Sequence, residues 1–311
     1  MVAPTRSDTL SDSWRDGIFN GKVVFCTGGA GDICSGQVRA MVFLGADACI
    51  IGRNVQKTES MAKNLAASRP GAQVLGYGGV DVRDYNSLQS AVDRCVAALG
   101  GIDFVIAGAA GTFLSPITSL SPAAFKAVVD IDLVGSYNTL KATLPALEKS
   151  ASKHTHDGGR TPASGTGGRI IFISATLHYR GTALITHGSA AKAGVDTLSS
   201  CTAIEFGPRG ITSNIIAPGP IAATEGTMRL MRLKRGENPM KGIPAGRWGT
   251  VKDVADATIY LFADTGSYMN GTIIVVDGGH WRTHGANDNA DFPYPNFLLS
   301  RNITGVGDAK L

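Results

Sequence analysis

The chain has 311 residues, of which 43% are hydrophobic and only 17% charged, a balance that excludes an intrinsically disordered protein. Its formal net charge of +4 is spread without a basic block, so the sequence does not indicate nucleic-acid binding. No apolar run reaches about 18 residues, which argues against a membrane span. The five cysteines form no CxxC or Cys/His cluster, so they indicate neither a metal site nor disulfides.

The predicted elements alternate between short apolar strands and amphipathic helices along most of the chain. We expect strands at residues 22–27, 48–51, 74–80, 104–106, 169–174, 213–217 and 272–276. Helices are expected at residues 34–44, 55–67, 87–98, 122–133 and onward toward 147, 189–206 and 251–262. Alternation of this kind predicts the α/β class: a single-domain, Rossmann-like, doubly wound parallel sheet with helices on both faces.

No internal repeat or linker divides the chain. We expect an N-terminal surface segment over residues 1–20, one main domain over 21–282, and a C-terminal tail over 283–311. The polar segment 150–168, rich in Gly, Ser and Thr, is expected to form an exposed loop before the fifth strand.

The run TGGAGDIC at residues 27–34 follows the first predicted strand and opens a helix. Its small residues let the backbone approach a pyrophosphate at the helix N-terminus, where free N–H groups and the helix dipole favour an anion. Asp32 brings an unfavourable negative charge to this place unless its carboxylate caps the helix and points away. The pattern indicates dinucleotide binding, and an ordinary glycine-rich turn is the alternative.

The second predicted strand ends in Gly52, Arg53 and Asn54. Dinucleotide-binding folds that prefer NAD place an acid here, which bonds the ribose 2′-hydroxyl. A guanidinium suits a 2′-phosphate instead, through its charge and its paired donors, and therefore favours NADPH over NADH. A solvated surface arginine is the alternative interpretation.

Four further runs resemble those of a known enzyme family: VDIDLVGSYNT at 129–139, SATLHYRG at 174–181, HGSAAKAG at 187–194 and PGPIAATEG at 218–226. With the glycine-rich loop, they resemble the short-chain dehydrogenase/reductase family, and within it the peroxisomal type of 2,4-dienoyl-CoA reductase. The family form of the loop is TGxxxGxG, so Asp32 and Cys34 stand in place of its second and third glycines. The resemblance covers about residues 12–282 and identifies 21–282 as a catalytic domain.

Two side chains common in that family are missing here. Most members have a tyrosine four residues before a helical lysine, and a serine thirteen residues before the tyrosine. These places hold Gly188 and Ala175, while Lys192 is retained. A ketone reductase without both would lack a proton donor for its alkoxide. Asp132 stands where most members have asparagine, and the resemblance implies that these departures are features of the subfamily.

The resemblance implies an NADPH-dependent enzyme that reduces 2,4-dienoyl-CoA to trans-3-enoyl-CoA in the β-oxidation of unsaturated fatty acids. Hydride adds at Cδ of the diene and the negative charge moves to the thioester oxygen, so no alkoxide forms. A water held by Asp132 and Lys192, the implied catalytic pair, then protonates Cα. A buried structural ion pair is the alternative for these two residues. For the chain, the alternatives are a catalytically silent nucleotide-binding relative or interaction protein, and a reductase of another conjugated substrate.

The resemblance also implies a set of binding residues. Those expected to hold NADPH are Thr27, Gly28, Gly29, Ala30, Asp32, Ile33, Arg53, Asn54, Asp81, Val82, Ala109, Lys192, Pro218, Gly219, Ile221 and Thr224. Those expected to hold the fatty acyl-CoA substrate are Arg53, Arg83, Phe113 and Ser121. His178, Tyr179 and His187 are expected as walls of the site rather than as its acid.

The chain ends in Ala309, Lys310 and Leu311. This small-basic-leucine ending is similar to the SKL peroxisomal address, which is read as an exposed C-terminus. Together with the family resemblance, it predicts a peroxisomal enzyme that is recognised by an import receptor. By analogy with the family we also expect a homo-oligomer.

Overall fold

The computed structural model describes residues 4–154, 166–230 and 242–283. Seven parallel strands form one sheet in the order β3-β2-β1-β4-β5-β6-β7. They are β1 (Val23–Thr27), β2 (Asp47–Gly52), β3 (Val74–Gly78), β4 (Phe104–Ala107), β5 (Arg169–Ile173), β6 (Thr212–Pro218) and β7 (Ile273–Val276). The chain builds outward first on one side of β1 and then on the other, so the predicted doubly wound parallel sheet is confirmed.

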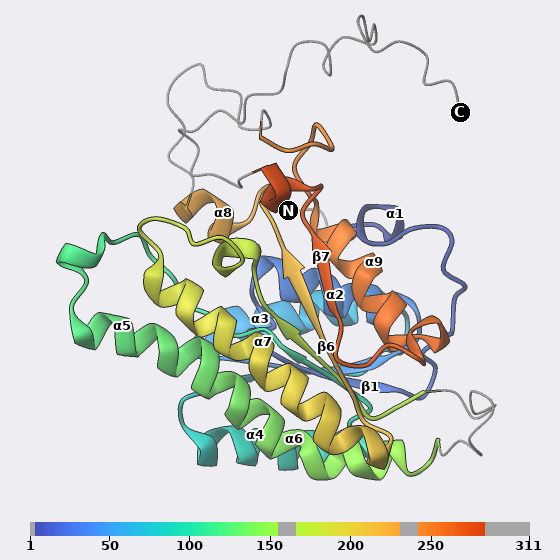
Figure 1. The fold of residues 1–311 in the computed structure, drawn as a ribbon. Coiled ribbons are helices and arrows are strands. Elements are labelled where there is room, and N and C mark those ends of the chain that lie inside the picture. The colour runs from blue at the N-terminus through green and yellow to red at the C-terminus, as the bar shows by residue number, and fades with distance from the viewer. Residues whose placement is uncertain (1–3, 155–165, 231–241, 284–311) are drawn as a thin grey trace, which may run out of the picture.

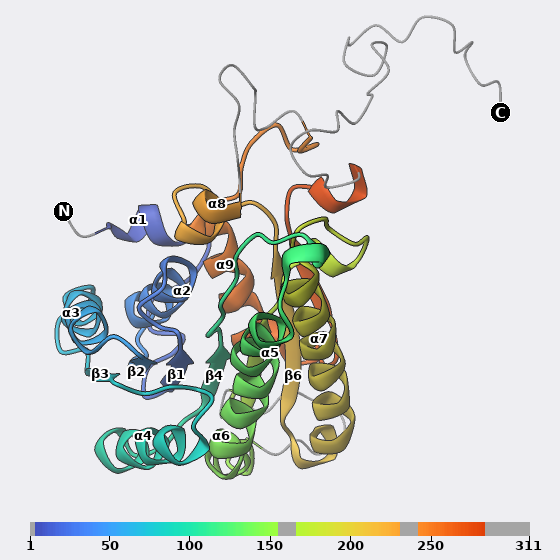
Figure 2. The same ribbon diagram turned by 90° about the vertical axis from the view of Figure 1, so that its left-hand side faces the viewer.

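Helices cover both faces of this sheet (Figures 1 and 2). They are α1 (Arg6–Thr9), α2 (Asp32–Phe43), α3 (Val55–Ala66), α4 (Tyr85–Leu99), α5 (Pro122–Val129), α6 (Gly135–Ala151), α7 (Thr186–Phe206), α8 (Glu225–Leu230) and α9 (Val251–Phe262). α2, α3 and α9 lie on one face, and α4, α6 and α7 on the other. Among the described residues, no helix is both long and apolar enough to cross a bilayer.

A π-helical turn over Asp130–Val134 separates α5 from α6. The sequence predicts one continuous helix from residue 122 toward 147, because the apolar spacing persists through this stretch. An inserted π turn shifts the register of the side chains that follow and is frequent at functional sites. It places Asp132 in a buried position between the two helices.

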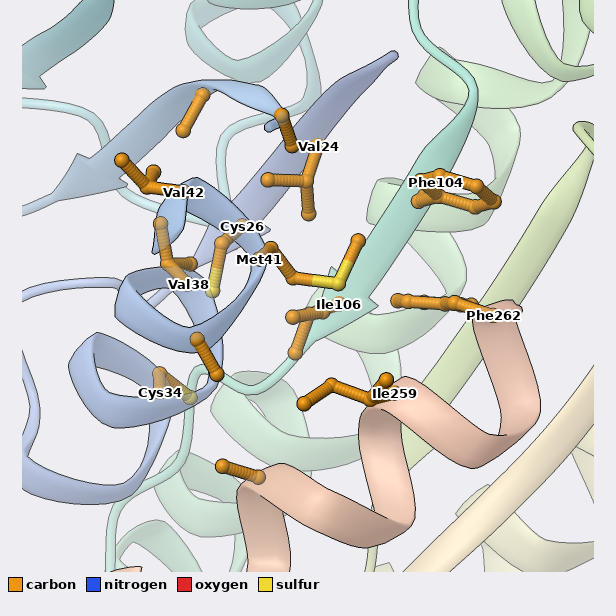
Figure 3. Packing of buried hydrophobic residues seen from close by; sticks show 14 of the residues in the cluster. Val24, Cys26, Cys34, Val38, Met41, Val42, Phe104, Ile106, Ile259 and Phe262 are labelled. Atoms are coloured by element: carbon orange, nitrogen blue, oxygen red, sulfur yellow. The ribbon is translucent and has the colours of Figure 1, made fainter. Parts of the chain in front are cut away.

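The core divides into two layers because alternate side chains of a strand point to opposite faces of the sheet. Val24 of β1 packs among the residues of α2 and α9, and its neighbour Phe25 packs on the other face. Figure 3 shows the first layer, where Met41 of α2 lies between the strands and α9. Phe104 of β4 stacks on Phe262 of α9 with ring centroids 4.7 Å apart. This packing joins the sheet to α2 and α9 on this face.

The segment before β1 does more than run over the surface. The side chains of Leu10 and Phe19 are buried in the same layer as Met41. Asp256 of α9 accepts hydrogen bonds from the backbone and hydroxyl of Ser11 and from the indole of Trp14. Two buried side chains and three hydrogen bonds to Asp256 thus join this segment to the domain.

Two sequence predictions fall partly or wholly outside the described residues. α6 extends to Ala151, into the segment predicted as the loop 150–168, of which residues 155–165 are not described. The tail from residue 284, with its expected targeting tripeptide, also lies outside the described residues.

Candidate active site

A cavity of about 790 Å³ opens at the carboxyl ends of the strands, where the order of the sheet reverses. Its walls come from the glycine-rich loop, the ends of β2 and β3, the end of β4, and the segment after β6. Fourteen of the residues expected to bind the cofactor line it: Gly28, Ala30, Asp32, Ile33, Arg53, Asn54, Asp81, Val82, Ala109, Lys192, Pro218, Gly219, Ile221 and Thr224. The cavity has the size and place of a dinucleotide site in this fold.

Thr27 and Gly29 shape the loop without lining the cavity. The buried hydroxyl of Thr27 accepts the backbone N–H groups of Gly108 and Ala109, at 3.1 and 3.3 Å, and so braces the loop against the end of β4. Gly28 has φ of +67°, and a Cβ atom there would lie 2.9 Å from the Cα of Ala109. At Gly29 a Cβ would meet Ile50 at 2.5 Å. The loop therefore needs glycine at both places.

Cys34 fills the place of the third family glycine because residue 108 has no side chain. A Cβ atom at Gly108 would clash with the Cys34 sulfur, which lies 3.8 Å from the Gly108 carbonyl oxygen. The Cys34 side chain thus fills space that is free because Gly108 has no side chain. The helix keeps its close approach to β4, and the loop keeps its shape.

The cavity corner at the ends of β2 and β3 carries positive charge. Arg53 and Lys57 both line it, while the side chain of Asn54 caps α3 by accepting the Lys57 N–H at 2.8 Å. Asp81 lines the same corner, and the Arg83 guanidinium binds its two oxygens at 2.6 to 3.1 Å. That pairing holds the pKa of Asp81 below its usual value. The corner therefore fits an anionic group such as a 2′-phosphate. Sequence reasoning missed Lys57, although a lysine one turn after Arg53 is a readable signal.

Asp132 and Lys192 form a buried ion pair next to the cavity. Nζ of Lys192 lies 3.2 Å from Oδ2 of Asp132, and the two side chains are only 10% and 3% exposed. Lys192 also donates to the carbonyl oxygen of Ile173 at 2.9 Å, and the Gly111 N–H donates to Oδ1 of Asp132 at 2.7 Å. Lys192 lines the cavity as well. Both charged groups are held in position by these bonds, but Asp132 is not among the residues that line the cavity.

Gly188 lies one helical turn before Lys192 on α7. A Cβ atom at this place would lie 3.3 Å from Ile185 and 3.4 Å from the Thr112 hydroxyl, which is tight. Ala175 lines the cavity where the family serine would stand. The chemistry of this site therefore has a carboxylate and an ammonium to use, in place of a phenol and a hydroxyl.

The other expected substrate residues lie outside the cavity lining. Phe113 is 39% exposed and its ring stacks on His187 at 4.4 Å, while Ser121 is the N-cap of α5. Arg83 is bound to Asp81. Burial lowers the pKa of His187. The roles of Phe113, Ser121 and Arg83 toward substrate stay predictions.

His178 and Tyr179 point to a partner that sequence reasoning missed. The ring of His178 and the hydroxyl of Tyr179 lie 2.7 and 3.3 Å from the carboxylate of Asp196 on α7. Burial is the main cause that raises the pKa of Tyr179, and its ring packs on Trp281. This cluster holds the loop after β5 and does not line the cofactor cavity.

Comparisons with known proteins agree with this geometry. A family model described as "Enoyl-(Acyl carrier protein) reductase" matches residues 29–280. A peroxisomal 2,4-dienoyl-CoA reductase of Saccharomyces cerevisiae, named as (3E)-enoyl-CoA-producing, is 47% identical over 86% of this chain and 87% of the relative. One from Danio rerio is 38% identical over 87% and 85%. A solved short chain dehydrogenase from Bacillus anthracis has a TM-score of 0.72 at 29% identity, over 86% and 98% of the two chains. The chain belongs to the short-chain dehydrogenase/reductase family.

Membership of the short-chain dehydrogenase/reductase family makes the protein an oxidoreductase that works with a nicotinamide dinucleotide. The shape of the site fits such a cofactor on its own evidence. Gly28 lines the cavity at the N-terminal end of α2, where a pyrophosphate is expected, and the basic corner of Arg53 and Lys57 fits an anion at the adenosine end. The family resemblance drawn from the motifs is confirmed.

Proposed function

We propose that this enzyme uses NADPH to reduce 2,4-dienoyl-CoA to (3E)-enoyl-CoA in the peroxisomal β-oxidation of unsaturated fatty acids. The relatives from Saccharomyces cerevisiae and Danio rerio carry this activity and this location in their names. The observation that carries the proposal is the buried pair of Asp132 and Lys192 beside Gly188. Such a site can hold a proton-donating water without a phenol, and reduction of a conjugated thioester needs its proton at carbon rather than at an alkoxide.

NADPH is proposed over NADH because of the charge at the end of β2. Arg53 and Lys57 line the corner where the adenosine ribose is expected. Asp81, the carboxylate of that corner, is already bound by Arg83. When bound, the cofactor supplies the hydride. The residues of the chain bind it, orient it and handle the proton.

Lys192 has three N–H donors, and two of them serve Ile173 and Asp132. We assign the third to the cavity, where it can bond a ribose hydroxyl or a water. A water bonded to both this ammonium and the carboxylate would lie near the acyl group and give a proton to Cα. It would take a proton in turn from the Lys192 ammonium, which solvent then reprotonates. Reduction at Cδ leaves its negative charge on the thioester oxygen, so the proton is needed at carbon and not at an alkoxide.

The acyl-CoA is proposed to lie along the open side of the same site. Phe113, Ser121 and Arg83 are proposed to contact it there, and Arg53 with Arg83 would face the phosphates of coenzyme A. Recognition by an import receptor through Ala309, Lys310 and Leu311, and assembly into a homo-oligomer, are proposed with the same function.

The test follows NADPH absorbance with a 2,4-dienoyl-CoA and identifies the position of the remaining double bond in the product. Asp132→Ala and Lys192→Ala should each lower kcat/KM by about 10² to 10⁴, because the water that donates the proton is then no longer held in place. Asp130→Ala is the matched control, since that carboxylate pairs with Lys126 on the helix surface and should change kcat/KM by less than about threefold.

No oxidation of NADPH by the wild type would refute the activity. Undiminished rates in both the Asp132 and the Lys192 variants would refute their role. A (2E)-enoyl-CoA product would show that the proton reaches a different carbon from the one proposed.

A further inference from the structure

Asp32 lies where the glycine-rich loop meets α8. It is the first residue of α2, and its Oδ2 atom accepts a hydrogen bond of 2.7 Å from the backbone N–H of Glu225, the first residue of α8. The two residues are 193 positions apart and both line the cavity. A single hydrogen bond therefore joins two of its walls.

α8 depends on such external contacts because it is only six residues long. A helix of this length is not stable on its own, and its first N–H groups have no partner within the helix. Thr224 supplies part of the cap, since its buried hydroxyl lies 3.3 Å from the Thr227 N–H and donates to the Ile221 carbonyl at 2.9 Å. The carboxylate of Asp32 accepts a hydrogen bond from the N–H of Glu225, which directly follows Thr224.

We propose that Asp32 is a positioning residue whose carboxylate fixes the start of α8 over the phosphate-binding loop. By doing so it sets the cavity wall that Thr224 and Thr227 form. Its effect on the cofactor rests on the proposed function, whereas its effect on α8 does not. The aspartate in place of a family glycine is then a structural tie between loop and helix.

The same carboxylate places a negative charge beside the loop expected to hold a pyrophosphate. Its hydrogen bond orders the wall of the site, and its charge opposes the bound anion. The two effects can be separated by substitution. Asp32→Asn keeps an acceptor oxygen and removes the charge, while Asp32→Ala removes both.

The experiment measures amide hydrogen exchange at Glu225 in the ligand-free, full-length enzyme, and NADPH affinity by fluorescence titration. We expect exchange at Glu225 to rise about tenfold or more in Asp32→Ala and to stay within about threefold in Asp32→Asn. The NADPH Kd of Asp32→Asn should fall about three- to tenfold at low salt, and this gain should shrink at about 0.5 M salt. Asp93→Asn and Asp93→Ala, at an exposed position of α4, change the net charge as much as the Asp32 variants do and should alter neither measurement.

Equal exchange at Glu225 in the wild type and in Asp32→Ala would overturn the proposal. Equally fast exchange at Glu225 in Asp32→Asn and Asp32→Ala would also overturn it, because the acceptor oxygen at residue 32 would then not be what holds the start of α8. A wild type that shows the expected exchange pattern but does not reduce dienoyl-CoA would overturn the proposed function alone, since the exchange needs no ligand.

Discussion

Cys34 and Gly108 show how a departure from a family motif can be absorbed by one facing residue. The sulfur occupies the space that a side chain at position 108 would need. The motif alone makes Cys34 look like a defect in the phosphate loop, because a sequence does not say which residue packs against which. Burial of a small thiol at this contact keeps α2 close to β4.

Gly108→Ala should lower the free energy of unfolding by about 1–3 kcal/mol, because the new methyl group overlaps the Cys34 sulfur. Adding Cys34→Gly should recover most of the loss, so that the double-mutant cycle gives a coupling of about 1–2 kcal/mol. Gly101→Ala is the control, because nothing lies within 4 Å of its Cβ position. Urea unfolding of the wild type, Gly108→Ala, Cys34→Gly, the double variant and Gly101→Ala measures these values, and additive losses would contradict the packing argument.

At the scale of elements, the parallel strands and the long helices were predictable, and the interruptions were not. α9 has the bounds that its apolar spacing and its flanking Thr250 predict, Val251–Phe262. The π turn over Asp130–Val134 has no such signal, since its residues are as apolar in spacing as the helices around it. α8 was missed because its six residues are too few to show a helical period, and the N–H of its first residue bonds Asp32, far away in the sequence.

α9 also offers a test of pH dependence at its N-terminal capping box. Arg247, with the hydroxyl and backbone of Thr250, holds the pKa of Asp253 well below its usual value. A lowered folded-state pKa stabilises the fold above the unfolded value near 4 and loses this contribution as the pH falls through the folded value. Asp253→Ala should therefore cost about 1 kcal/mol at neutral pH and progressively less below about pH 4.

Chemical unfolding of the wild type and Asp253→Ala at a series of pH values gives this difference directly. Thr250→Ser keeps the capping hydroxyl and should follow the wild type at each pH. A difference between wild type and Asp253→Ala that grows toward acid pH would have the wrong sign for this carboxylate.

At the scale of the whole molecule, the location of the site could be predicted from the sequence, but the contacts among its residues only in part. Carboxyl ends of parallel strands meet at one edge, so the glycine loop, Arg53 and the segment from Pro218 could be brought together from sequence. The pairing of Arg83 with Asp81 could not, because both were assigned to ligands rather than to each other. Nor could the contact between Asp196 and His178, which depends on how the loop after β5 folds back on α7.

The N-terminal segment raises the question of where the part of the chain that unfolds cooperatively begins. Leu10 is fully buried in the layer formed by α2 and α9, and Ser11 and Trp14 are tied to Asp256 next to it. Leu10→Ala should therefore lower the free energy of unfolding by about 2–4 kcal/mol, through lost burial and the cavity left behind. Ile117→Ala removes a side chain that is 72% exposed and should cost less than about 0.5 kcal/mol.

If residues before β1 fold together with the domain, Leu10→Ala should move a single unfolding transition to lower urea while its steepness stays the same. Tryptophan fluorescence, which includes Trp14, and far-ultraviolet circular dichroism should then give coincident curves. An early fluorescence change ahead of the loss of helix would show instead that the segment detaches by itself. In that case the domain boundary would lie near β1, because the contacts with α9 would add little to the stability of the rest.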